Sequence, residues 1–257
     1  MRFFLARFLL AFRKILLRLA SVCGTFIVLI LKPEDHEKLT RWFYEKDEAL
    51  ETWGNQAVIE QGLVEEEEIF VSTYLKGKEK CLVLNCGGGR ETIALAKRGF
   101  EVIGVDQSGP LVEEAKRYAV REGLSCRYVA QNVLELSLGE TFGAIFLGSN
   151  MYSAIPLKEK RIAFLKRAGA HLSKEGLFYM EFAGHVSPQE IRHYPVKKFL
   201  AGLFGNRFYG LGDRLFAGWH YEHAFFRQED LQEEITASGL EAAVLDFRAG
   251  YAVLRRA

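Results

Sequence analysis

The stretch from residue 81 to residue 106, CLVLNCGGGRETIALAKRGFEVIGVD, constrains the fold more than any other part of this sequence. Its first four residues are apolar and predict a short strand that is buried on both faces. Three glycines follow at 87–89, and because they lack Cβ atoms the chain can turn sharply there and a ligand can approach the main-chain N–H groups. Residues 90–98 then suit a helix that stops at Gly99.

An acidic residue ends the second strand of this unit. Residues 101–105 predict that strand, and Asp106 follows it, nineteen positions after Gly87. A carboxylate at this point can accept hydrogen bonds from both hydroxyls of a ribose. Thr92 stands where a dinucleotide-binding fingerprint would have its third glycine, so NAD binding is disfavoured. The unit is therefore expected to hold a nucleoside.

Further landmarks follow in an order that is typical of one family. The five segments are LVLNCGGGRET, VIGVDQS, YVAQNVLEL, FGAIFLGSNMY and HLSKEGLFYMEF. On these segments, residues 80–257 resemble the class I S-adenosylmethionine-dependent methyltransferases. The resemblance implies S-adenosylmethionine as the cofactor and methyl transfer as the reaction.

The predicted elements fit an α/β fold. Strands and helices alternate along the chain, which favours a mainly parallel sheet with helices on both faces. Beyond the first unit, helices are expected at 110–121, 158–171 and 229–238, and strands at 127–130, 142–147, 177–182, 243–247 and 251–255. The expected architecture is a Rossmann-like, mainly parallel seven-stranded sheet with an N-terminal helical extension and an aromatic-rich cap insertion.

The resemblance also implies which residues bind the cofactor. Gly87 and Gly89 would pass close to its methionine and ribose portions, and Asp106 would take the ribose hydroxyls. Asn132 and the Val133 amide would meet the adenine. The whole expected set is Asn85, Cys86, Gly87, Gly88, Gly89, Asp106, Gln107, Asn132, Val133 and Gly148.

The chain departs from the family's usual pattern at three positions. Val83 stands where an acidic residue is usual, so a carboxylate that would orient the cofactor's amino group is missing. Asn85 replaces a glycine, but asparagine tolerates left-handed backbone better than other non-glycine residues. Asn132 replaces an aspartate, and its side-chain oxygen still accepts a hydrogen bond without bringing a negative charge.

Three residues are candidates for a direct part in the reaction. Tyr152 stands where members of the family approach the transferring methyl, and simple packing is its alternative role. His220 and His223 are candidates for the general base, because a neutral histidine can take a proton from an attacking hydroxyl or amine. The sequence does not decide between them. No metal site is expected, because residues 219–221 predict a strand, in which residues three apart point to opposite sides, and no cysteine or carboxylate pair completes a ligand set.

A basic and apolar segment precedes the α/β region. Residues 1–32 carry six basic residues and no acidic one, and since the whole chain has a net charge of +1 the remainder carries −5. As a helix, this segment has Arg7, Lys14 and Arg18 on one face and Phe and Leu side chains on the other. It is expected to lie on a membrane surface through residues 1–31, with packing on the body of the protein, on a partner or on a second subunit as the alternative. Its uncharged stretch of thirteen residues is shorter than the roughly 20 that span a bilayer.

Two further regions are expected to surround the site. Residues 33–79 predict a helical lead-in that covers the mouth of the cofactor cleft, with helices at 34–51 and 56–75. The acidic run 65–68 within it is expected to be a solvated helix face. Residues 185–227, rich in aromatic residues and glycine, are expected to cap the site and shape an apolar acceptor pocket. A cap with its own small core is the alternative.

These features together predict methyl transfer to a small, rather apolar or lipid-like acceptor at the cytoplasmic surface of a membrane. Four cysteines without C-x-x-C spacing are typical of reduced thiols in a cytoplasmic protein. The acidic body disfavours a nucleic-acid partner. A homo-oligomer is left open. The competing interpretation is a catalytically inactive, methyltransferase-like binding or scaffold protein attached to the membrane.

Overall fold

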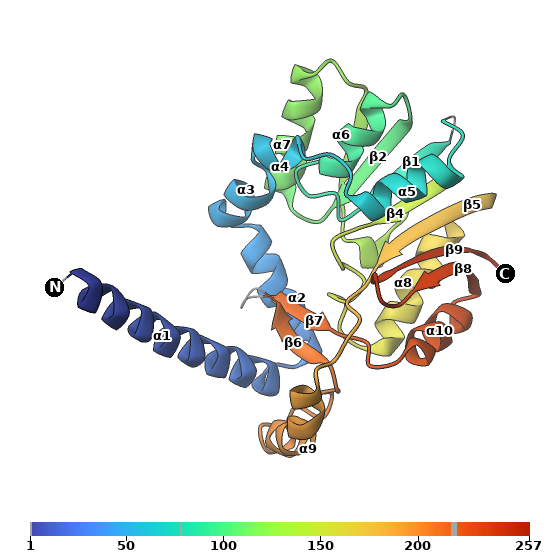
Figure 1. Ribbon diagram of the computed structural model, residues 1–257. Helices are drawn as coiled ribbons and strands as arrows, with labels where there is room; N and C mark the ends of the chain where they lie inside the picture. The colour runs from blue at the N-terminus through green and yellow to red at the C-terminus, as the bar shows by residue number, and fades with distance from the viewer. Residues whose placement is uncertain (1, 78, 217–219) are drawn as a thin grey trace.

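A mixed seven-stranded sheet forms the centre of the molecule. The computed structural model describes residues 2–77, 79–216 and 220–257, and the side chains of all of these except 2–11 and 15. The strand order is β3-β2-β1-β4-β5-β9-β8 (Figure 1). The first five strands are parallel, and β9 is antiparallel to both of its neighbours. The strands are β1 (Lys80–Leu84), β2 (Glu101–Asp106), β3 (Cys126–Ala130), β4 (Phe142–Leu147), β5 (Leu172–Glu181), β8 (Leu240–Asp246) and β9 (Tyr251–Arg256).

This sheet confirms the predicted Rossmann-like fold. Among its strands, β5 differs most from the prediction: it begins at Leu172, whereas the sequence predicted a strand from residue 177. The early start reflects pairing of Leu172 with Phe142, ahead of a register shift in the ladder between β4 and β5. The carboxyl ends of the parallel strands lie at the same edge of the sheet, so the loops after β1, β2 and β4 meet there.

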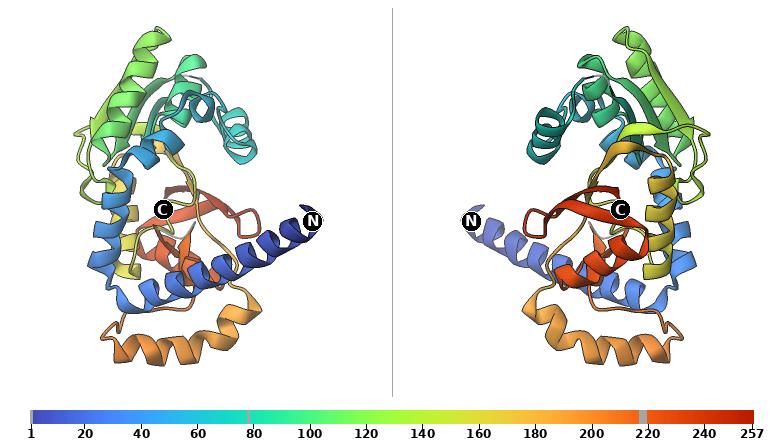
Figure 2. Two further views of the ribbon diagram at one scale, coloured as in Figure 1. Left: turned by 90° about the vertical axis from the view of Figure 1, so that its left-hand side faces the viewer. Right: turned by 90° about the vertical axis from the view of Figure 1, so that its right-hand side faces the viewer.

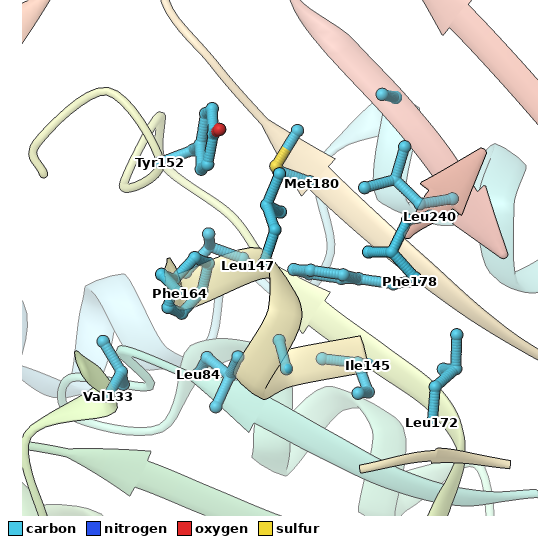
Figure 3. Packing of buried hydrophobic residues seen from close by; sticks show 14 of the residues in the cluster. Leu84, Val133, Ile145, Leu147, Tyr152, Phe164, Leu172, Phe178, Met180 and Leu240 are labelled. Carbon is cyan, nitrogen blue, oxygen red and sulfur yellow. The ribbon is translucent and has the colours of Figure 1, made fainter. Parts of the chain in front are cut away.

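Alternate residues of β1 pack on opposite faces of the sheet. Leu82 and Leu84 belong to the core under α8 and α10, part of which Figure 3 shows. Cys81 and Val83 belong to the core under α5, α6 and α7. Both faces of the parallel strands are therefore buried, as their continuous apolar runs predict. The covering helices are α5 (Glu65–Tyr74), α6 (Arg90–Lys97), α7 (Gly109–Arg121), α8 (Lys158–Ala170) and α10 (Gln228–Ala237).

The region before β1 is helical, but its helices are shorter than predicted. The expected helix over 34–51 is divided by a turn in which the Lys46 N–H donates to the Phe43 carbonyl, 3.1 Å away. The expected helix over 56–75 is interrupted at Gly62, whose φ of +72° leaves the helical region. The remaining elements here are α1 (Arg2–Ile30), α2 (Pro33–Tyr44), α3 (Asp47–Trp53) and α4 (Gln56–Ile59). A 3-10 turn, η1 (Val133–Glu135), follows β3.

The insertion between β5 and α10 folds as a small cap. It contains α9 (Pro188–Leu203), β6 (Asp213–Phe216) and β7 (His220–His223), and the two strands pair with each other and not with the main sheet. Helix α9 was not predicted, and Pro195 lies inside it. Of the predicted strand at 219–221, Trp219 lies outside the described residues, while His220 and Tyr221 lie in β7.

The first helix extends away from the body of the protein (Figures 1 and 2). Its C-terminal end packs on the cap, where Val28 and Leu29 form a cluster with Ala201 and Tyr209. The Asn206 side-chain amide donates to the carbonyls of Val28 at 3.1 Å and Leu31 at 2.8 Å. Within the described part of the chain, none of the helices has both the length and the apolar character needed to cross a membrane.

Candidate functional site

The turn between β1 and α6 uses left-handed backbone at three positions. The φ angles are +52° at Asn85, +51° at Gly87 and +100° at Gly89. Asn85 therefore adopts the conformation that was expected of it in place of a glycine. The Gly89 N–H donates to the carbonyl of buried Cys86 at 2.9 Å, which closes the turn.

The three glycines of this turn have different surroundings. A Cβ atom on Gly87 would meet no atom within 4 Å, so this residue faces open space in which a ligand can approach the main chain. A Cβ on Gly88 would lie only 2.4 Å from the Trp53 carbonyl oxygen. The space beside Gly89 is taken by protein atoms, with the Tyr128 hydroxyl 3.0 Å from the position of a Cβ. Gly88 thus lets the helical lead-in pack directly on the turn, and Gly87 leaves the turn open.

The carboxylate of Asp106 links the ends of β1 and β2. One of its oxygens accepts from the Gly87 N–H at 2.9 Å and the other from the Ser108 N–H at 2.8 Å. Burial raises the pKa of Asp106, and these main-chain donors oppose that rise. The Ser108 hydroxyl in turn donates to the Tyr44 carbonyl at 2.8 Å, so the end of α2 is tied to the same loop. The Gln107 N–H is a third main-chain donor to the Asp106 carboxylate, which leaves one of its roughly four acceptor sites for a ribose hydroxyl.

A small cleft of about 70 Å³ is lined by Gln107, the residue after Asp106, and by part of α2. Asn132 lies in its wall, where its Oδ1 accepts from the Leu134 N–H at 3.0 Å and so begins the turn η1. The side chain that was expected to meet the adenine is thereby held in place. The lining residues that belong to the expected cofactor set are Asn85, Gln107, Asn132 and Val133, and those from α2 are Glu37, Thr40 and Arg41.

A buried charged group lies against Gly148, at the end of β4. A Cβ on Gly148 would lie 2.9 Å from Glu67 Oε1 and 3.1 Å from Glu91 Oε1. Arg90 binds Glu67 through both terminal nitrogens, at 2.8 and 2.9 Å, and binds Glu91 at 2.6 Å. Glu181 is near enough to raise the pKa of Glu91 further. Three acids thus share one arginine, and the group carries an excess of negative charge when all are ionised.

The charged group corrects one expectation from the sequence. The acidic run 65–68 was expected to be a solvated face, but Glu67 is 0% exposed and pairs with Arg90, 23 positions further along the chain. Helical periodicity marks which residues share a face, whereas the identity of the buried partner is set by how α5 packs on α6. The sequence contained no signal for this pairing.

Tyr152 lies in the core and not in the open cleft. It is 0% exposed, and its hydroxyl donates to Glu234 Oε2 at 2.7 Å (its position is labelled in Figure 3). Its ring stacks on Phe225 with a centroid separation of 6.0 Å. These contacts support the packing role and argue against contact with a transferring methyl.

The two candidate histidines lie on opposite faces of the strand pair β6–β7. His220 is buried, and burial lowers its pKa to about 4. His223 pairs with Asp213 across the two strands, and its Nδ1 lies 2.8 Å from Asp213 Oδ1. The main-chain N–H of His223 donates to the carbonyl of Ser153, which follows β4. Among the described residues no three or more His, Cys, Asp and Glu side chains are grouped to hold a metal ion.

Several groups that could bind parts of an adenosyl ligand lie along one edge of the sheet. It combines an open main-chain turn at Gly87, a fixed carboxylate at Asp106 and a polar wall at Asn132 on one edge of the sheet. The excess of negative charge beside Gly148 suits a cationic group at the other end of the ligand.

Part of the sequence is similar to known methyltransferases. Residues 82–176 match the model of a family described as a methyltransferase domain. A ubiquinone biosynthesis O-methyltransferase from Coxiella burnetii is 44% identical over 59 residues, which cover 23% of this chain and 25% of that protein. A cypemycin N-terminal methyltransferase from a Streptomyces species is 26% identical over 100 residues, covering 39% of this chain and 40% of that protein. The chain thus spans about a quarter of the length of the first of these relatives.

Solved structures share the fold over most of the chain. A 1,6-didemethyltoxoflavin-N1-methyltransferase from Burkholderia thailandensis has a TM-score of 0.60 at 17% identity, covering 88% of this chain and 91% of that one. An S-adenosylmethionine-dependent methyltransferase from Clostridium acetobutylicum has a TM-score of 0.56 at 16% identity, covering 86% and 98%. At this level of identity the likeness shows the fold.

Proposed function

We propose that the chain is a class I S-adenosylmethionine-dependent methyltransferase and transfers a methyl group from S-adenosylmethionine to a small, apolar or lipid-like acceptor at a membrane surface. The match of residues 82–176 to a methyltransferase domain supports this proposal. The observation that carries the cofactor half of this proposal is the carboxylate of Asp106, held by the Gly87 N–H beside an open turn. The name of the Coxiella burnetii relative favours an oxygen atom of the acceptor.

Different residues of the chain would bind different parts of the cofactor. Asp106 would accept hydrogen bonds from the ribose hydroxyls, and Asn132 and the Val133 amide would meet the adenine. Glu67 and Glu91, which lie against Gly148, would replace the acid that is missing at Val83. Binding of the α-ammonium of the methionine portion would favour the ionised form of Glu91, whose pKa is raised by burial.

The reaction needs little from the protein beyond alignment and the removal of one proton. When bound, S-adenosylmethionine supplies a methyl group that is already activated by a cationic sulfur. Holding two reactants in line contributes roughly 7 to 11 kcal/mol toward the barrier in well-oriented systems. The sheet edge and the cap would provide this alignment, because the loops after β1, β2 and β4 end at one place.

The membrane half of the proposal rests on α1. Arg13, Lys14 and Arg18 are exposed on one side of the helix, and the opposite side carries exposed apolar residues. The exposed apolar residues on that side are Phe12, Leu16, Leu19, Val22, Phe26 and Ile30. An amphipathic helix with basic and apolar faces suits the boundary of an anionic bilayer.

Calorimetric titration with S-adenosylhomocysteine tests the cofactor site. We expect the wild-type protein to bind, and Asp106→Ala to bind at least about tenfold more weakly, since a charge-assisted hydrogen bond contributes about 1.5 to 3 kcal/mol. Glu175→Ala, an exposed acid near the beginning of β5, is the matched control and should bind like the wild type. A folded wild-type protein that does not bind would favour the scaffold interpretation, and an unaffected Asp106→Ala would refute the assignment of this carboxylate.

A further inference from the structure

Helix α9 of the cap carries an exposed apolar stripe. Val196, Phe199 and Leu203 are spaced by three and four positions, so they share one face of the helix. Phe199 is 66% and Leu203 is 67% exposed, whereas Ala201 on the opposite face is packed in the cluster at the end of α1. Contiguous exposed apolar side chains of this size mark an interaction surface in globular proteins.

The stripe on α9 is continuous with the exposed apolar side of α1. Helix α9 lies at the end of the molecule opposite α7, next to the C-terminal part of α1 (Figure 2). The rings of Phe26 in α1 and Phe204 at the end of α9 meet edge to face with their centroids 6.5 Å apart, and both residues remain exposed. The two helices thus present one connected apolar surface. We call the exposed apolar side of α1 together with Val196, Phe199, Leu203 and Phe204 the two-helix face.

The same two parts of the chain concentrate positive charge. Residues 1–32 carry six basic residues, residues 191–212 carry four, and neither segment has an acidic residue. Since the whole chain has a net charge of +1 and these two segments carry +10, the remainder carries −9. Arg192 and Arg207 are exposed and flank the stripe along the chain. Basic side chains beside an apolar stripe suit the boundary between the headgroups and the acyl chains of an anionic bilayer.

A second copy of the chain fits this face less well than a bilayer does. Two-fold contact between identical copies brings one patch against the same patch of the partner. The basic residues of both copies would then lie close together, with no acid of either segment to pair with them. An anionic bilayer supplies an apolar phase and the opposite charge at once.

From these observations we propose that α9 is a second membrane-binding element and that the two-helix face docks as a unit on an anionic lipid bilayer. The inference deepens the proposed function and rests on its membrane half, which assigned contact to α1 alone. Because α9 belongs to the cap, docking through both helices holds the cap against the bilayer and fixes the orientation of the body. Attachment through α1 alone would leave that orientation free.

Sedimentation with phosphatidylglycerol vesicles tests the contribution of α9. The double variant Phe199→Ser with Leu203→Ser leaves α1 intact. We expect its partition coefficient to fall at least about tenfold, because two large apolar side chains no longer leave water on docking. Val120→Ser with Ile69→Ser is the matched control, since these apolar residues are exposed on α7 and α5, and it should partition like the wild type.

Fluorescence measures whether α9 enters the bilayer. Phe199→Trp places a tryptophan on the stripe. When this variant binds phosphatidylglycerol vesicles, its emission beyond that of the wild type should shift to the blue and be quenched by lipids brominated on their acyl chains. Val120→Trp is the control and should show neither effect. A helix that only stabilised the cap would leave the tryptophan at residue 199 unquenched, and that result would contradict the proposal.

The outcomes separate this inference from the proposed function. A wild type that does not sediment with the vesicles would overturn the membrane half of the proposed function and this inference with it. Equal sedimentation of the wild type and the Phe199→Ser, Leu203→Ser variant would overturn the inference alone. A wild-type dimer that this variant converts to a monomer in sedimentation equilibrium, with vesicle binding unchanged, would assign the face to a second copy.

Two further measurements show that the variants are intact. Thermal melts and titration with S-adenosylhomocysteine should give wild-type values for every variant, because the stripe lies on the cap surface and outside the cofactor cleft. If the double serine variant fails to fold, the quenching of Phe199→Trp decides the matter.

Discussion

At the scale of single residues, Glu91 is a buried acid of the proposed cofactor site whose protonation affects the stability of the fold. Burial raises the pKa of Glu91 from 4.5 to about 7, the nearby Arg90 opposes this rise, and Glu67 adds to it. The side chain lies next to Gly148, at the edge of the sheet where the cofactor is proposed to bind. An acid held this way keeps its proton in the folded protein at pH values where the unfolded chain has lost it.

Replacing Glu91 by Gln should therefore change how stability depends on pH. In the wild type the free energy of unfolding should fall as the pH rises from about 4.5 to about 7, by up to about 3 kcal/mol at roughly 1.4 kcal/mol per pH unit. Glu91→Gln lacks this titration, so it should be more stable than the wild type at pH 8 and similar to it near pH 4.5. Urea unfolding at both pH values measures the difference. Glu65→Gln, an exposed acid of the same run, should keep the wild-type slope, and equal slopes in all three proteins would contradict the assignment.

At the scale of elements, α1 differs from every other described helix in how far it stands from the body (Figure 2). Its end is attached through Val28 and Leu29, so removing residues 1–31 would also remove part of a packed cluster. Substitution of its exposed basic residues leaves that cluster intact and is the cleaner test of membrane binding.

Reversing three charges on α1 should release the protein from anionic vesicles. Arg13, Lys14 and Arg18 changed together to Glu should abolish sedimentation with phosphatidylglycerol vesicles, since each basic residue near such a surface contributes about 1 kcal/mol. The matched control changes the exposed Lys166, Arg167 and Lys174 to Glu. Undiminished sedimentation of the α1 variant, or an equal loss in the control, would argue for attachment by another surface or by overall charge.

At the scale of the whole molecule, a buried ion pair joins parts of the chain that are far apart in sequence. Arg161 in α8 donates to Glu234 in α10 at 2.9 and 2.6 Å, and the Tyr152 hydroxyl donates to the same carboxylate. The side chains of the pair are only 4% and 3% exposed. The network connects the loop after β4 with both helices on that face of the sheet.

Removing one of the two charges of this pair should destabilise the entire fold. Arg161→Met leaves the Glu234 charge buried without its counter-charge, so we expect a loss of about 3 to 5 kcal/mol in urea unfolding. The double variant Arg161→Met with Glu234→Leu should recover part of that loss, because both charges are then removed. Lys158→Met breaks the exposed pair with Glu233 and should cost at most about 1 kcal/mol. A loss in Arg161→Met as small as that of the control would show that the buried pair does not hold the fold together.

The features that the sequence by itself determined depend on residues that lie close together along the chain. The glycine turn, the acid at residue 106 and the alternation of strands and helices depend on residues close together in the chain, and their spacing alone predicts a Rossmann-like sheet and a ribose-binding edge. Only the tertiary structure decided which side chains meet across long separations: Glu67 with Arg90, Tyr152 with Glu234, and the packing of α1 on the cap. The reason is physical, because a hydrogen bond or ion pair forms wherever packing brings donor and acceptor within about 3 Å, and packing depends on the whole chain.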